Sequence, residues 1–152
     1  MNEFSTAGVT FKYAVEATAG TRPTTGYTII PNVKSTPDFN PEPSTLDVTD
    51  LSDKVWKRSI EGLKDIGGSL TFGANLTPEL KTAWETCVAD YATAKVDGKA
   101  VWFEVAIPNF DSFYFAGKPA ELGLKAMEVD AVAEIDLFVT PNEVLGFATA
   151  ST

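Results

Sequence analysis

Histidine is absent from this sequence, and cysteine occurs only once, at Cys87. Without histidine, the chain has no Ser-His-Asp or Cys-His nucleophilic arrangement and no histidine-containing metal site. One cysteine forms no internal disulfide and excludes a four-cysteine zinc site, and a lone thiol within a helical pattern is expected to be a buried apolar group. We therefore expect no cofactor and no metal, and the common hydrolase mechanisms are excluded.

Positive charge and long apolar runs are also scarce. Twelve Lys and Arg stand against 21 Asp and Glu, a net charge of −9, which argues against a phosphate-binding surface for nucleic acid. Apolar runs such as Ala100 to Ile107 are far shorter than the roughly 20 residues of a membrane span. The N-terminus has neither the basic segment nor the apolar run of a signal peptide. We expect no membrane association, and synthesis and assembly in the cytoplasm.

Patterns that would indicate an enzyme or a calcium site are incomplete. The sequence has no Gly-Lys-Ser/Thr phosphate loop and no dinucleotide fingerprint. Asp47, Asp50 and Asp53 are regularly spaced, but the glycine and the terminal glutamate of a calcium loop are missing. The mid-chain acids show no spacing that identifies a glycosidase acid and nucleophile. We therefore expect a protein that is not an enzyme.

The alternation of apolar and polar residues predicts one domain over residues 1–152 that is mainly β, with one helix. Strands are expected at 8–16, 27–30, 100–108 and 112–118. Thr77, followed by Pro78 and Glu79, is a helix start, and an apolar stripe continues to Lys95. Short connections between strands favour antiparallel sheets that close as a sandwich or barrel.

Residues 31–53 contain four prolines and few large apolar residues, which indicates a long loop or arm. Structureless loops of this length usually serve function or assembly, so the arm is a candidate partner-binding element. Leu46, Val48 and Leu51 are among its few large apolar residues. After it, apolar residues in 54–62 and 68–73 predict a hairpin that turns at Asp65 to Gly68.

Residues 126–140 form the longest alternation in the chain and predict a single strand. One face is apolar, whereas the other carries Glu128, Asp130, Glu134 and Asp136. In an isolated domain this is most simply a solvated outer face. However, like charges two residues apart repel, and no Lys or Arg lies within the strand to compensate. A function that needs the charge would explain this, so these four carboxylates are candidates for the wall of a water-filled channel, with Glu61 and Asp65 as weaker candidates.

Several segments carry a family resemblance through their order along the chain: PSTLDVTDL at 43–51, RSIEGLKD at 58–65, GSLTF at 68–72, the helix at 77–95, and the strands at 101–107 and 128–139. This order resembles the phage major tail tube proteins and covers about residues 8–145. The resemblance implies an antiparallel β-sandwich or split barrel with a flanking helix, which forms hexameric rings that stack into a hollow tube with an acidic lumen.

The resemblance also implies that the arm at 31–53 bridges subunits or rings, with Leu46, Val48 and Leu51 as contact residues. It implies a place and partners as well. The chain would be a structural protein of the virion tail, in a long non-contractile tail or a phage-derived particle. Its partners would be other copies of itself, a tape measure protein inside the tube, and tail initiator, distal tail and tail terminator proteins. DNA would pass through the tube without specific binding.

Two other functions remain open at this point. A carbohydrate-binding or adhesion β-sandwich would use exposed aromatic residues as stacking platforms, and the candidates are Trp56, Trp102, Phe110 and Tyr114. The tube protein of a contractile injection system would follow the same ring principle as a phage tail tube.

Overall fold

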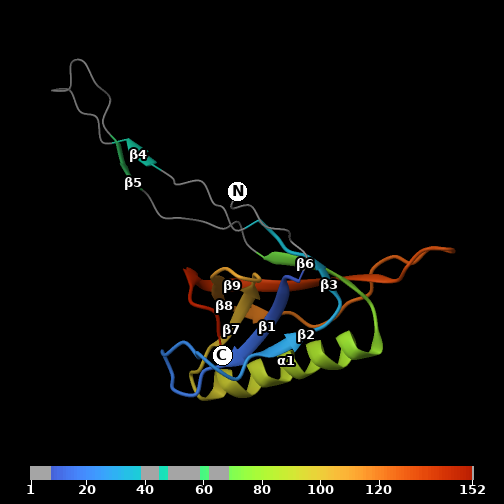
Figure 1. The fold of residues 1–152 in the computed structure, drawn as a ribbon, viewed down its shortest axis with the longest axis horizontal. Coiled ribbons are helices and arrows are strands. Elements are labelled where there is room, and N and C mark those ends of the chain that lie inside the picture. The colour runs from blue at the N-terminus through green and yellow to red at the C-terminus, as the bar shows by residue number, and fades with distance from the viewer. Residues whose placement is uncertain (1–7, 39–44, 48–58, 62–68, 152) are drawn as a thin grey trace. The chain divides into compact units, whose positions relative to one another are not determined.

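The structure is a computed structural model that describes residues 8–38, 45–47, 59–61 and 69–151. The chain divides into two compact units. The main unit comprises Met1–Pro37 and Ser69–Thr152, and the inserted unit is Asp38–Gly68. Figure 1 shows the strands of the main unit with the helix alongside them.

The main unit is one seven-stranded sheet in which all paired neighbours are antiparallel. Its order is β2-β1-β7-β8-β9-β6-β3. The strands are β1 (Thr10–Val15), β2 (Thr28–Ile30), β3 (Val33–Ser35), β6 (Leu70–Asn75), β7 (Val101–Ala106), β8 (Ser112–Pro119) and β9 (Glu134–Ala148). The predicted mainly β, antiparallel fold is confirmed, and the sheet forms a nearly closed barrel.

Two residues link the two ends of the sheet. β2 and β3 lie at opposite ends of the strand order, yet only Pro31 and Asn32 separate them along the chain. Asn32 has a φ of 63°, a left-handed conformation that asparagine tolerates better than most residues. Its carbonyl accepts a hydrogen bond from the Asn75 amide at 3.0 Å. The chain thus leaves β2, which pairs with β1, turns at Asn32 and enters β3, which pairs with β6, so that the barrel nearly closes.

Stacked phenylalanine rings fill the barrel interior. Phe11 of β1 and Phe72 of β6 have ring centroids 4.1 Å apart, although β7, β8 and β9 separate their strands in the sheet. Phe103 and Phe115 stack at 5.2 Å between β7 and β8. A contact between strands so far apart in the sheet requires the sheet to curl on itself. The stacked phenylalanine rings thus pack the two sides of the barrel against each other.

The helix α1 (Pro78–Val96) packs against β1, β2, β7 and β8. The predicted N-cap is confirmed, because the Thr77 hydroxyl accepts a hydrogen bond from the Leu80 amide at 3.1 Å. Leu80, Trp84 and Cys87 are buried, as the apolar stripe predicts. The Trp84 indole also donates to the Ala120 carbonyl at 2.7 Å. The helix is thereby tied to the end of β8.

The inserted unit contains a strand pair that differs from the predicted hairpin. β4 (Thr45–Asp47) pairs antiparallel with β5 (Ser59–Glu61). The prediction that 54–62 pairs with 68–73 is therefore wrong, since β6 pairs with β9 and β3 instead. Residues 33–35, expected within the long loop, form β3 of the barrel. Local alternation identifies a strand but not its partner, and here the partners are distant in sequence.

The predicted strand at 126–140 begins eight residues later than expected and ends eight residues later. Residues 126–133 are not a strand, and Asp130 has a φ of 61°, which is incompatible with extended backbone. β9 continues past Pro141 to Ala148 because the register with β8 shifts between Ala116 and Gly117. Such a bulge accommodates a proline within a strand.

A membrane-crossing helix would need a long, strongly apolar stretch, and no helix within the described residues has one.

Candidate assembly surfaces

The structure places only two of the four predicted channel carboxylates on one strand face. Glu134 and Asp136 lie on the outer face of β9, whereas Ile135, Leu137 and Val139 point into the core. The alternation is therefore correct from residue 134 onward. Glu128 and Asp130 are exposed on the loop before β9. The structure thus divides the predicted acidic face between a strand and a loop.

Lysines from other segments pair with both of the strand carboxylates. Lys34 of β3 forms an ion pair with Glu134, and the Lys125 amine lies 3.4 Å from the Asp136 carboxylate. The hydrogen bond and the charge of Lys34 lower the pKa of Glu134 below its ordinary value. Because these pairs are partly exposed, they contribute little to stability. They do reduce the net negative charge of this face, and the sequence alone does not reveal them because Lys34 lies about 100 residues from Glu134.

The outer face of β9 next to this pair is open. Phe138 is 44% exposed and lies opposite Thr71 of β6. The hydroxyls of Ser69 and Thr140 are 3.2 Å apart on the same pair of strands. This face, defined by Glu134, Asp136, Phe138 and Thr140, therefore combines carboxylates, a hydroxyl and one aromatic ring in contact with solvent.

The predicted arm residues fall largely outside what the structure describes. Leu46 lies in β4, opposite Ile60 of β5. Val48 and Leu51 lie outside the described residues. Glu61 ends β5, and Asp65 is again outside the described part of the chain. The role of the arm in assembly therefore stays a prediction.

Two of the aromatic residues considered as carbohydrate platforms are buried. Trp102 is 4% exposed, and its indole donates to the Glu16 carboxylate at 2.9 Å. Tyr114 is fully buried, and the Arg22 guanidinium lies 4.3 Å from its ring centroid. Phe110 is half exposed, and Trp56 lies outside the described residues. Trp102 and Tyr114 are thus structural, which removes most of the basis for a sugar-stacking face.

Two buried carboxylates were not recognised from the sequence. Glu104 is fully buried and accepts hydrogen bonds from the Ser151 hydroxyl at 2.6 Å, the Ser151 amide at 3.1 Å and the Tyr114 hydroxyl at 3.0 Å. Burial raises the pKa of Glu104, but these hydrogen bonds outweigh it and hold the pKa below its ordinary value. The only sequence signal is one acid within the apolar run VWFEVAI.

Glu16, which directly follows β1, is a second buried carboxylate held by hydrogen bonds. Its carboxylate accepts hydrogen bonds from the Ala100 amide at 2.8 Å, the Trp102 indole at 2.9 Å and the Gly20 amide at 3.1 Å. Burial raises the pKa of Glu16, and the three hydrogen bonds lower it further than burial raises it. Both carboxylates are satisfied structural anchors, and in neither case does the arrangement resemble a catalytic pair.

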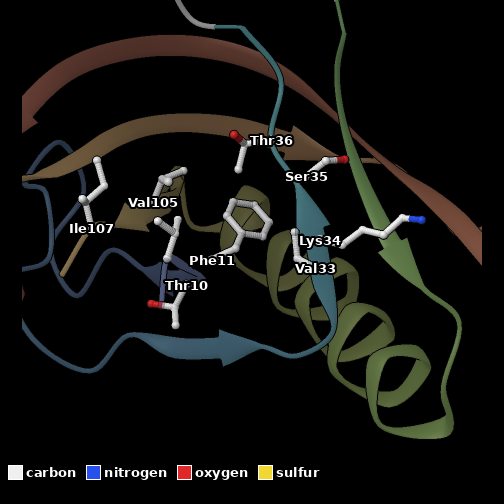
Figure 2. A pocket seen from close by; sticks show the side chains of 9 residues that line it. Thr10, Phe11, Val33, Lys34, Ser35, Thr36, Val105 and Ile107 are labelled. Carbon is white, nitrogen blue, oxygen red and sulfur yellow. The ribbon is translucent and has the colours of Figure 1, made fainter. Parts of the chain in front are cut away.

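A pocket of about 470 Å³ opens at the barrel seam, between β3 and the ends of β1 and β7 (Figure 2). Phe11 lies at its centre, between Val105 and Ile107 on one side and β3 on the other. The pocket is apolar at its base and carries hydroxyls of Thr10 and Ser35. Within the described part of the chain, no group of three or more Asp, Glu or Cys side chains is placed to hold a metal ion.

Comparisons with known proteins identify the fold. Neither a scan against protein-family models nor a search of curated proteins finds a match. Among solved structures, a chain from the tail of an empty GTA particle, determined with helical refinement and C6 symmetry, is 17% identical, with a TM-score of 0.55 over 93% of this chain and 96% of that one. A chain of the six-fold symmetrised baseplate of the anti-feeding prophage (AFP) is 8% identical, with a TM-score of 0.57 over 100% of this chain and 99% of that one. At these identities the similarity concerns the fold alone, and the chain therefore has a fold of the phage-tail type.

Proposed function

We propose that the protein is a structural subunit of a tail tube, in which hexameric rings stack into a hollow tube that conducts DNA. The observation that carries the proposal is the end-to-end similarity of fold to a chain from a particle tail with C6 symmetry. Both chains are covered almost completely, so the similarity of fold extends over nearly the full length of this chain and is not confined to one part of it.

The surface chemistry of the main unit supports this role. The end strands β2 and β3 have only three residues each, and the part of β9 after Val139 pairs with β8 alone, so assembly can use side chains, loops and this strand edge. The open face with Glu134 and Asp136 is the best candidate for the channel wall. In such a wall the carboxylates would neutralise Lys34 and Lys125, which would otherwise bind DNA phosphates. Glu128 and Asp130 lie on the exposed loop before β9 rather than on this face.

In this proposal the arm joins neighbouring subunits or rings, and Leu46, Val48 and Leu51 contribute its apolar contacts. The tube encloses a tape measure protein during assembly, and it begins on initiator or distal tail proteins and ends at a terminator protein. The protein functions in the virion tail after assembly in the host cytoplasm.

A second candidate is a subunit of a single ring in a baseplate. It is favoured by the alignment with the AFP baseplate chain over nearly the full length of both proteins. The two candidates differ in how rings continue, because a tube protein stacks on itself and a baseplate ring stops after one layer. A tube protein of a contractile injection system would also stack. The purified subunit therefore does not distinguish it from a phage tail tube, and the particle that contains the tube has to be identified.

Negative-stain electron microscopy of the purified chain over a concentration series tests the proposal. We expect six-membered rings and hollow tubes of uniform diameter at high concentration. Rings that never stack would favour the baseplate candidate. A strictly monomeric protein at all concentrations, also in the presence of tail initiator proteins, would contradict both.

A further inference from the structure

The loop at residues 121–133, between β8 and β9, exposes an unusual amount of apolar surface. Figure 1 shows this orange segment extending beyond the end of the sheet. Its most exposed large apolar side chains are Val129 at 92%, Leu124 at 76%, Val132 at 72% and Met127 at 56%. Soluble monomers rarely gather such side chains on one protruding element, and such clusters commonly mark protein contacts. Glu128 and Asp130, also exposed, lie among them.

The pocket in the barrel seam has the complementary shape and chemistry. Its apolar lining comes from β1, β3, β7 and their flanks: Val9, Phe11, Val33, Val105 and Ile107. Figure 2 shows the hydroxyls of Thr10, Ser35 and Thr36 around this lining. Lys34 also borders the pocket, but its amine is held in the ion pair with Glu134. The lining includes no Asp or Glu, although the chain has a net charge of −9. Hydroxyls beside an apolar floor therefore suit an apolar segment that carries carboxylates.

The loop does not fill the pocket of its own chain. The lining residues lie between 9 and 11, 33 and 36, and 105 and 107, and they include nothing from 121–133. We propose that the loop of one subunit inserts into the barrel-seam pocket of the next, with Val129 and Met127 against the apolar floor and Glu128 or Asp130 near the hydroxyls. The volume of about 470 Å³ lies within the range of about 300 to 1,000 Å³ of pockets that hold small ligands, so it can take more than one side chain.

A second copy of the chain is the occupant that these two surfaces specify. A convex loop and a concave pocket on the same chain define a heterologous contact, in which different patches of two copies meet. Such contacts generate closed rings when the rotation closes. The inference thus rests on the proposed function and adds the pair of surfaces that join neighbouring subunits.

Two variants test the contact from its two sides. The loop variant combines Val129→Ser and Val132→Ser. The pocket variant combines Val9→Glu and Ile107→Glu, which lie outside the regular strands and would place carboxylates opposite Glu128 and Asp130. Burying one such apolar side chain corresponds to roughly a tenfold change or more in association. We expect each variant to need on the order of 100-fold more protein to assemble. Val96→Ser is the matched control, because Val96 is 86% exposed on the helix and belongs to neither surface.

An equal mixture of the two variants gives the sharper result. The loop variant keeps an intact pocket and the pocket variant keeps an intact loop, so one good contact can form between them. Sedimentation velocity should show dimers in the mixture, monomers for each variant alone, and rings for the wild type and for V96S. Thermal unfolding by circular dichroism checks that both variants are folded.

The outcomes separate this inference from the proposed function. A wild type that never assembles contradicts the proposed function. If the wild type assembles and the folded loop variant assembles equally well, the inference is overturned but the proposed function is not. If the pocket variant is destabilised as a monomer and the loop variant assembles normally, the pocket is filled from within the chain, which also overturns it. If both variants are folded and their mixture contains only monomers, the loop and the pocket do not pair with each other.

Discussion

Glu104 of β7 and Ser151 near the C-terminus are joined by two hydrogen bonds, at 2.6 Å to the serine hydroxyl and 3.1 Å to its amide. The Tyr114 hydroxyl also reaches the Thr149 carbonyl at 2.7 Å. A buried carboxylate therefore fixes the last residues of the described chain against the outer side of the sheet. This arrangement makes the stability of the main unit dependent on the charge of one side chain.

Replacing Glu104 with glutamine should destabilise the fold at neutral pH by about 1.5 to 3 kcal/mol, because hydrogen bonds to a charged group are lost. In the wild type, the pKa of Glu104 is lower in the folded state than its ordinary value. The unfolded chain therefore binds the proton more readily, and stability falls as the pH drops below about 5.

Urea unfolding between pH 3 and pH 7 measures this effect. The free energy of unfolding of E104Q should change less with pH than that of the wild type. Glu143→Gln is the control, because Glu143 is exposed on β9. Equal acid sensitivity of E104Q and the wild type would show that other groups, such as Glu16, account for it.

Phe72→Ala should lower the free energy of unfolding by about 3 to 5 kcal/mol, since Phe72 is fully buried and its ring stacks on Phe11 across the barrel. Phe138→Ala, one strand away and 44% exposed, should cost less than about 1 kcal/mol. Chemical denaturation of both variants provides the comparison. Similar losses for the two would contradict a core organised around the Phe11 and Phe72 contact.

Gly117→Ala should destabilise the fold by about 1 to 3 kcal/mol through overpacking. A Cβ at Gly117 would lie 2.7 Å from Val139 Cγ1 and 2.9 Å from the Thr140 carbonyl oxygen, where β8 and β9 shift register. A Cβ at Gly123 would meet nothing within 4 Å, so Gly123→Ala serves as the control. Thermal melting distinguishes the two, and an unchanged melting temperature for G117A would count against the tight bulge.

Charge reversal at Glu134 and Asp136 should slow DNA release from assembled particles, because two added lysines would join Lys34 and Lys125 and bind phosphates. Charge reversal at Glu128 and Asp130 should affect assembly more than release, since these two residues lie on the exposed loop. DNA release from particles complemented with each double variant is the measurement. Normal release from particles that carry E134K and D136K would exclude the β9 face as the channel wall.

The local pattern of the sequence predicted the main elements of the barrel well. The alternation around Phe11, Phe103 and Ile135 correctly identified inward-facing residues, and Thr77 correctly marked the start of the helix. These features depend on neighbouring residues only. The same alternation failed before Glu134, because Asp130 adopts a left-handed conformation that hydrophobic periodicity does not encode.

The candidate surfaces were harder to predict because they depend on partners distant in sequence. Lys34 of β3 reaches Glu134 only in the folded barrel, and Lys125 reaches Asp136 from the loop before β9, so the strand itself gave no sign of compensation. The pocket is likewise formed by three segments that approach one another only in the folded chain.

Asn32 connects two events that are usually separate. Its carbonyl receives the Asn75 amide at the barrel seam, and its side chain donates to the Thr77 hydroxyl at 2.7 Å, the same oxygen that caps α1. Opening the seam would therefore also loosen the first turn of the helix. In native-state hydrogen exchange, the amides of Asn75 and Leu80 should open together, as one cooperative unit. Barrel closure and helix initiation would then belong to a single step of folding.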